Sequence, residues 1–262
     1  MHAVNQVVAV SFVFAAFLFG GMLLLLELGR RWGTRRLTVD AEGAREGIGV
    51  VDGAVFALLG LLLAFTFSGA AARFDERRAL IVQEVNDIST AWLRLDVLPA
   101  EVQPTLRENF RRYVDLRLEI YRNVSDPAAE QQALARSSAV QSEIWNAAVA
   151  GTRGGAAPSA PMLLLPALNA MFDIATTRAV ARKTHPPLII FVMLAVFAYI
   201  GSFLAGYGMA GGKARSWIHM IGFAATVAGA VYVIIDLEFP RSGLIRIDAA
   251  DQMLVELRQS MK

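Results

Sequence analysis

The stretch GAVFALLGLLLAFTFSGAAARFDERR, residues 53–78, decides the fold of this chain. From Gly53 to Ala72 it contains no ionisable side chain, and a helix of that length crosses about 30 Å of hydrocarbon. It then enters the charged run 73–78, and no glycine or proline interrupts the chain before Pro99. The sequence therefore predicts a membrane span that leaves the bilayer as one long helix.

Small residues recur at helical spacing along this span and form a narrow stripe on one face. The stripe consists of Gly53, Ala57, Gly60, Ala64, Ser68 and either Ala71 or Ala72. Because small side chains let two helix backbones approach closely, another helix can pack there. The flanking leucine and phenylalanine side chains suit lipid and a hydrophobic constriction equally well.

Three further apolar stretches are long enough to span a membrane: 7–28, 188–209 and 218–235. The first ends in the basic and aromatic run 29–36, which is typical of a membrane interface, and we expect it to be a retained span. The short turn 210–216 predicts that the last two spans form an antiparallel hairpin. A second small face occurs on the last span, at Gly222, Ala225 and Gly229.

Amphipathic helical patterns fill the region between the two pairs of spans. One apolar seam has heptad-like spacing and consists of Ile81, Val85, Ile88, Trp92 and Leu95. Further helices are predicted at 105–123, 128–149 and 161–183, with a flexible link at 151–158 and a last amphipathic helix at 249–259. We expect the seam to pack within the chain, although an oligomer contact would also use it.

These patterns predict an all-α polytopic membrane protein with four transmembrane helices in two pairs and an intervening helical soluble domain. We expect the first transmembrane pair at 1–72 and an extramembrane domain that continues the second span at 73–185. The second transmembrane pair follows at 186–239, and an amphipathic C-terminal helix occupies 240–262.

Composition excludes several classes of function. Hydrophobic residues make up 55% of the chain and charged residues 18%, and the hydrophobic residues come in blocks, so membrane lipid is an expected partner. The arginines gather at the ends of these blocks, which argues against nucleic acid. The chain has no cysteine and its three histidines are isolated, so we expect no metal and no cofactor. The spans offer no convergent acid, base or nucleophile, and we expect no enzyme.

Basic residues on the short loops favour a cytoplasmic first loop and a cytoplasmic turn between the last two spans. In a bacterial inner membrane, both termini and the central domain would then be extracytoplasmic. Arginines that flank the central domain oppose this orientation, and they are Arg73, Arg77, Arg78, Arg178 and Arg182.

Two stretches resemble a known family. The first is LLLAFTFSGA at 61–70, followed by RFDERR at 73–78 and LRLD at 93–96, and the second is DLEFPRSG at 236–243. They resemble the bacterial membrane family described as having a bestrophin-like domain. Bestrophins are ring-shaped ion channels whose second span lines the pore with hydrophobic side chains. The resemblance implies pore-lining roles for Leu61, Phe65, Phe67 and Ser68.

The chain departs from bestrophins in two respects. Bestrophins place the domain between their span pairs in the cytoplasm, against the loop count above. No acidic cluster here resembles their calcium clasp, so the resemblance does not imply anion selectivity.

Charged residues near the span ends are candidates for a pore vestibule or a subunit interface. They are Arg73, Asp75, Arg77, Arg78, Asp236 and Arg241. The group at 73–78 would also suit a solvated, salt-bridged helix surface, and Asp236 could instead pair with Arg241 across the turn at Pro240.

The sequence therefore supports two functional hypotheses. The first is a homo-oligomeric ion channel or pore lined by the second span, with the helical domain as a vestibule or gate and with ions as its cargo. The alternative is a non-conducting membrane sensor or scaffold that acts through its helical domain.

Overall fold

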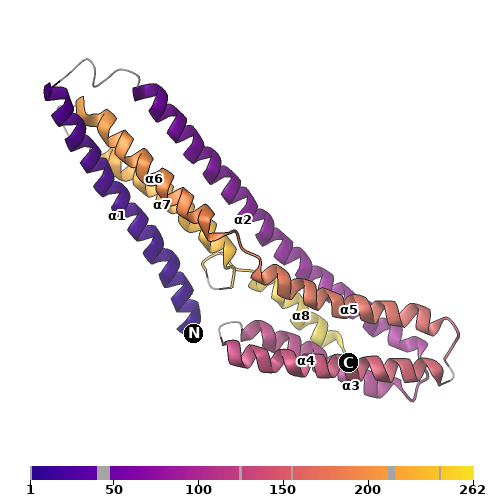
Figure 1. Ribbon diagram of the computed structural model, residues 1–262. Coiled ribbons are helices and arrows are strands. Elements are labelled where there is room, and N and C mark those ends of the chain that lie inside the picture. The colour runs from indigo at the N-terminus through magenta and orange to yellow at the C-terminus, as the bar shows by residue number, and fades with distance from the viewer. Residues whose placement is uncertain (1, 40–47, 124–125, 155, 212–215, 242) are drawn as a thin grey trace. The chain divides into compact units, whose positions relative to one another are not determined.

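The computed structural model describes residues 2–39, 48–123, 126–154, 156–211, 216–241 and 243–262, and these residues contain helices and no strand (Figure 1). The α-helices are α1 (His2–Val39), α2 (Ile48–Leu93), α3 (Gln103–Arg122), α4 (Pro127–Arg153), α5 (Ala160–Lys183), α6 (Leu188–Gly208), α7 (Trp217–Glu238) and α8 (Asp248–Ser260). Two short 3-10 helices are η1 (Arg94–Val97) and η2 (Met209–Gly211). The all-helical prediction is confirmed for the described residues.

The chain divides into two compact units. Unit 1 consists of Met1–Asn5, Arg73–Thr184 and Pro240–Lys262, and unit 2 of Gln6–Ala72 and His185–Phe239. The helix α2 contributes to both, because it runs unbroken from Ile48 to Leu93.

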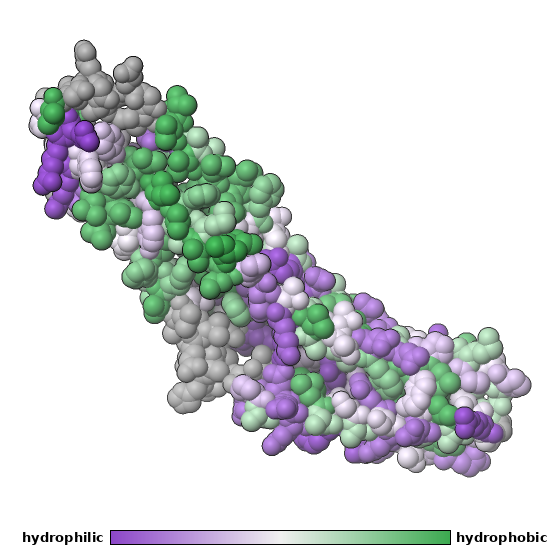
Figure 2. Space-filling model, in the orientation of Figure 1, coloured by the Kyte–Doolittle hydropathy of each residue, from purple (hydrophilic) through white to green (hydrophobic). Residues whose placement is uncertain are grey.

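Four helical stretches among the described residues are long and apolar enough to cross a membrane. They are Ser11–Val39, Gly49–Val97, Ala160–Gly211 and Trp217–Glu238. In the space-filling view, the visible surface of unit 2 is largely hydrophobic, whereas unit 1 shows many hydrophilic residues (Figure 2). Apolar surface on this scale is stable in contact with lipid and not with water.

In unit 2, α1 and α6 approach so closely that only glycine fits between their backbones. A Cβ atom added at Gly29 would overlap the carbonyl oxygen of Phe203, and one added at Gly206 would overlap that of Leu26. At Gly33 an added Cβ would lie 2.6 Å from the Cβ of Ala210. Gly29 and Gly33 are four residues apart and form the small-residue motif that permits close helix contact in lipid.

A small apolar core holds the helices of unit 2 together. Its fully or largely buried members are Leu18 and Met22 of α1, Leu59 of α2, Ala198 of α6, and Ala224, Val227 and Val231 of α7. The helices α6 and α7 run side by side, as the short turn between them requires (Figure 1). Every helix of unit 2 therefore contributes one apolar face to this core.

Unit 1 is a helical bundle with a larger core. The helix α3 packs along α4 and α8, and α5 packs against α4 and η1. The heptad-like seam of α2 lies inside this unit: Ile81, Ile88 and Leu95 have no exposed surface, and Trp92 is 9% exposed. The seam therefore packs within the chain, as expected.

The helix α4 is longer than predicted, and the C-terminal helix is more deeply packed than its amphipathic pattern indicated. The helix α4 continues to Arg153 and takes up the start of the predicted flexible link, and Gly154 then provides its C-cap. At its other end, the carboxylate of Asp126 accepts hydrogen bonds from the backbone N–H groups of Ala128 and Ala129, an ordinary N-cap. The C-terminal helix α8 is part of the main core through Leu254, Leu257 and Met261.

Candidate functional site: the pore face and a buried charge network

The face of α2 that carries the small-residue stripe is exposed in unit 2. Among the described residues, no atom lies within 4 Å of a Cβ added at Gly53 or Gly60, and Ala57 and Ala64 are exposed. In the most apolar window of this helix, 11% of residues are buried, compared with 33% for α7. The stripe therefore does not mediate packing within unit 2.

The candidate pore-lining residues are all exposed on α2. Leu61 is 51% exposed, Phe65 68% and Phe67 47%, and Ser68 is also exposed. At 100° per residue, Leu61, Phe65 and Ser68 point away from Leu59, which is buried, whereas Phe67 lies about 80° from it. The structure thus brings three candidates onto one surface, with Phe67 at its edge, without showing what covers it.

The opposite half of α2 packs inside unit 2. The rings of Phe56 and Phe223 meet edge to face, with centroids 5.8 Å apart. A Cβ added at Gly201 of α6 would lie 3.2 Å from the ring of Phe56. These contacts hold α2 against α6 and α7 and fix which half of the helix faces outward.

The small face predicted on the last span is open in the same way. Gly222 and Gly229 have no atom within 4 Å of an added Cβ, and Ala225 between them is exposed. Unit 2 therefore presents two helix faces, one on α2 and one on α7, that would permit close approach of another helix.

The vestibule candidates at 73–78 separate into exposed and buried groups. Asp75 and Arg78 are exposed and form an ion pair at 3.6 Å, which contributes little in water. Arg77 is 7% exposed and donates hydrogen bonds to the carbonyl oxygens of Ala181 and Thr184. Arg77 thus caps the C-terminus of α5 and is not part of a solvated surface.

The two remaining candidates lie in different units. Asp236 belongs to unit 2 and is 3% exposed. Arg241 belongs to unit 1, where its guanidinium donates to the carboxylate of Asp251, one bond being 2.8 Å. Near Asp236, the ring of His185 stacks on Phe239 and its Nδ1 lies 3.3 Å from the carboxylate of Glu238.

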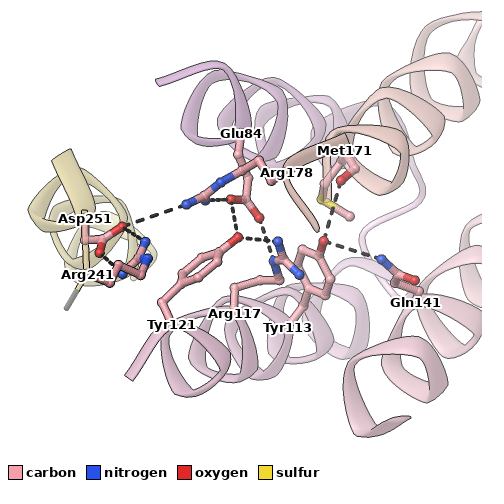
Figure 3. Close-up of polar contacts among 9 residues, drawn as sticks. All are labelled: Glu84, Tyr113, Arg117, Tyr121, Gln141, Met171, Arg178, Arg241 and Asp251. Atoms are coloured by element: carbon pink, nitrogen blue, oxygen red, sulfur yellow. Dashed lines mark hydrogen bonds and ion pairs between the residues drawn. The ribbon is translucent and has the colours of Figure 1, made fainter. Parts of the chain in front are cut away.

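A buried carboxylate forms the centre of a polar network in unit 1 (Figure 3). Glu84 of α2 has no exposed surface. Its Oε1 accepts a hydrogen bond of 2.6 Å from Arg117 of α3. Its Oε2 accepts hydrogen bonds from Arg178 of α5 and, at 2.9 Å, from the hydroxyl of Tyr121. Both oxygens are therefore satisfied, as a buried charge requires.

Tyr121 extends the network to the C-terminal segment. The guanidinium groups of Arg117, Arg178 and Arg241 lie 5.1, 4.0 and 5.0 Å from the centre of its ring. Asp251 of α8 binds Arg241 and lies 3.8 Å from Arg178. Because three cations face two carboxylates, the electron-rich ring offsets part of the excess positive charge.

Burial raises the pKa of Tyr121, and the positive charge of Arg117 lowers it by less. The phenol therefore stays protonated and donates to Glu84. Burial also raises the pKa of Tyr113, whose hydroxyl lies 3.5 Å from the carbonyl oxygen of Met171 (Figure 3). Both neutral phenols keep the polar interior of unit 1 hydrogen-bonded.

Glu84, Arg117 and Asp251 were not identified from the sequence. One signal was available in the sequence. Glu84 lies three residues after Ile81 and four before Ile88, and Arg117 lies four residues after Tyr113 and three before Ile120. A charged residue at a core position of an amphipathic helix requires a buried partner. The identity of that partner has no signature along the chain.

No group of three or more potential metal-ligating side chains occurs among the described residues. Surface grooves lie on both units. One, of about 360 Å³, lies between α3 and α4 and is lined by Arg112, Asp115, Leu116, Glu119, Arg136, Ala139 and Val140. The other, of about 330 Å³, lies at the end of α1 and is lined by Trp32, Arg35, Arg36 and Val39.

Comparisons with known proteins agree with this architecture. A family model described as a Bestrophin-like domain matches residues 7–251. A mutant of a bacterial bestrophin homologue from Klebsiella pneumoniae has a similar structure, with a TM-score of 0.68 and 16% sequence identity. The match covers 92% of this chain and 96% of that one, and at this identity it concerns the fold alone. No curated protein matches the chain.

Proposed function

Because the chain belongs to the bestrophin-like family, we propose that it is a homo-oligomeric ion channel whose pore is lined by α2. The observation that carries the proposal is the exposed face of α2, where Gly53 and Gly60 meet nothing within unit 2. In lipid, apolar surface alone gives helices no reason to associate, and small residues favour contact by close packing. We expect the partner to be a second copy of the chain, because most oligomers are symmetric assemblies of identical subunits.

In a ring of copies, α2 helices around the axis would narrow the passage with Leu61 and Phe65, and with Phe67 at the edge of the same surface. A constriction lined by such side chains stops ions by dewetting, and small rotations of the helices would open it. Ser68 would offer a hydroxyl to a hydrated ion just past the aromatic residues. We propose no catalytic role for any of these side chains.

A non-conducting sensor or scaffold is the second candidate. One observation favours it: α2 has no ionisable side chain from Gly53 to Ala72, so no charged ring within the span would attract or select ions. Under this reading the exposed face still assembles copies, but no water-filled path forms between them.

Single-channel recording from purified protein in a planar bilayer separates the two candidates. The channel predicts discrete openings, with a reversal potential under a salt gradient that reports the ion preference. Phe67→Ala should raise the unitary conductance or the open probability. Phe17→Ala is the matched control, because Phe17 is 74% exposed on α1 and lies outside the proposed pore. Silence from folded, inserted protein would favour the scaffold.

We also propose a bacterial inner-membrane location with both termini and residues 73–185 extracytoplasmic. The absence of cysteine makes this directly testable. A single cysteine replacing the exposed Gln131 of α4 should react with a membrane-impermeant maleimide in spheroplasts. Labelling only after the membrane is permeabilised would reverse the orientation.

A further inference from the structure

The groove at the end of α1 has the composition of an anion site. Trp32, Arg35, Arg36 and Val39 line its 330 Å³, and their spacing of three, one and three residues places them on one helix face. Arg30 and Arg31 both pair with Glu27, whereas neither Arg35 nor Arg36 has a carboxylate partner among the described residues. In the part of the chain that the structure describes, these two neighbouring guanidinium groups meet no carboxylate.

The groove continues an exposed apolar face of the same helix. Phe17 is 74% exposed, Leu24 60% and Leu28 44%, and at 100° per residue all three lie within about a quarter-turn of Trp32. The opposite face of α1 is buried, with Leu18 at 1% and Met22 and Leu26 at 0%. One face of α1 thus presents an apolar strip about three turns long that ends in an aromatic ring and two cations with no carboxylate partner among residues 2–39 and the other described ranges.

We propose that this face of α1 binds an anionic phospholipid, with the headgroup phosphate held by Arg35 and Arg36. Guanidinium groups bind phosphate through two parallel hydrogen bonds, which suits a fixed headgroup. The indole of Trp32 lies at headgroup depth, where its amphipathic ring is stable, and an acyl chain follows Phe17, Leu24 and Leu28. This inference is independent of ion conduction.

A free phosphate ion shares the headgroup chemistry but not the acyl chain. The apolar strip favours the lipid, because it adjoins the groove and is not covered within unit 2. The two sources respond differently to competition. Inorganic phosphate would displace a bound ion but would compete poorly with a lipid that is also held by its chain.

Native mass spectrometry tests the proposal by measuring which lipids stay bound to the protein. The full chain is released from nanodiscs that contain equal amounts of phosphatidylglycerol and phosphatidylcholine. Wild type should retain phosphatidylglycerol in preference, and Arg35→Gln/Arg36→Gln should reduce that retention by roughly tenfold or more. The matched control is Arg122→Gln/Arg153→Gln, which removes two exposed cations from unit 1 and should retain phosphatidylglycerol as wild type does.

Equal retention of both lipids by wild type, or equal loss in the test and control variants, would overturn the site and leave only a general attraction of charges. Displacement of the signal by millimolar phosphate would overturn the lipid as the occupant. Circular dichroism verifies that the variants remain helical. If the double variant does not fold, the single variants Arg35→Gln and Arg36→Gln provide the test, and each should retain less phosphatidylglycerol than wild type.

Discussion

Glu84 and Arg178 lie 94 positions apart in the chain and form an ion pair with side-chain exposures of 0% and 6%. They belong to α2 and α5, and Glu84 also binds Arg117 and Tyr121 of α3. One carboxylate therefore ties three helices of unit 1 together. Removing it would leave the buried Arg117 without a carboxylate and Arg178 with only Asp251, 3.8 Å away, which costs far more than the intact pair contributes.

Glu84→Gln should lower the free energy of unfolding by about 3 to 5 kcal/mol. The amide keeps the shape but not the charge, so Arg117 loses its counterion and Arg178 keeps only Asp251. Thermal unfolding in detergent, followed by circular dichroism, measures the change. Glu76→Gln on the exposed part of the same helix is the control and should alter stability by less than about 0.5 kcal/mol. Equal effects of the two substitutions would show that the network contributes nothing.

Alkaline pH should destabilise unit 1 through Tyr121. Its pKa in the folded protein is raised, so the unfolded chain releases the phenolic proton first. The stabilisation is fully present below about pH 10, the ordinary tyrosine value, and decreases as the pH rises above it. Thermal midpoints between pH 8 and pH 11 measure this decrease.

Tyr121→Phe should flatten that pH dependence, although it loses the hydrogen bond to Glu84 and starts from a lower midpoint. Tyr113→Phe is a useful comparison, because Tyr113 is also buried but lies outside the ion pairs. A pH profile unchanged by Tyr121→Phe would show that another group causes the alkaline loss.

Gly29→Ala should destabilise unit 2 by about 1 to 3 kcal/mol, because the added methyl group overlaps the backbone of Phe203. Gly20→Ala is the matched control in the same helix. Nothing lies within 4 Å of a Cβ at Gly20, so this change should be neutral or slightly stabilising. The detergent concentration at the midpoint of unfolding, measured for each variant in increasing denaturing detergent, gives the change in stability. Similar midpoints for the two variants would contradict the close contact of α1 and α6.

Gly60→Leu should disrupt assembly while leaving the protomer folded. The position is open within unit 2, so a larger side chain causes no clash there, but it would hold another copy of α2 away. Light scattering in mild detergent gives the oligomer mass. Gly20→Leu adds the same side chain at an open position on α1 and should keep the wild-type mass. Wild-type mass for Gly60→Leu would exclude this face as the subunit contact.

The sequence by itself determined the helices and the family. Runs such as Gly53–Ala72 are apolar for the full thickness of a bilayer, and the spacing of Ile81, Ile88 and Leu95 marks a buried face; both signals are local and can be read along the chain. The two quoted stretches pointed to a bestrophin-like domain, which the match over residues 7–251 confirms.

Only the tertiary structure decided which residues meet. The sequence placed Gly53 on a small-residue stripe for helix packing and Gly29 in an interfacial basic run, yet Gly29 is enclosed by α6 and Gly53 is open. The sequence also predicted that Arg77 lies on a charged surface, whereas the structure buries Arg77 against the end of α5. Such outcomes depend on how each helix is rotated about its axis. That rotation is set by side-chain packing between positions far apart in the chain, and no local propensity records it.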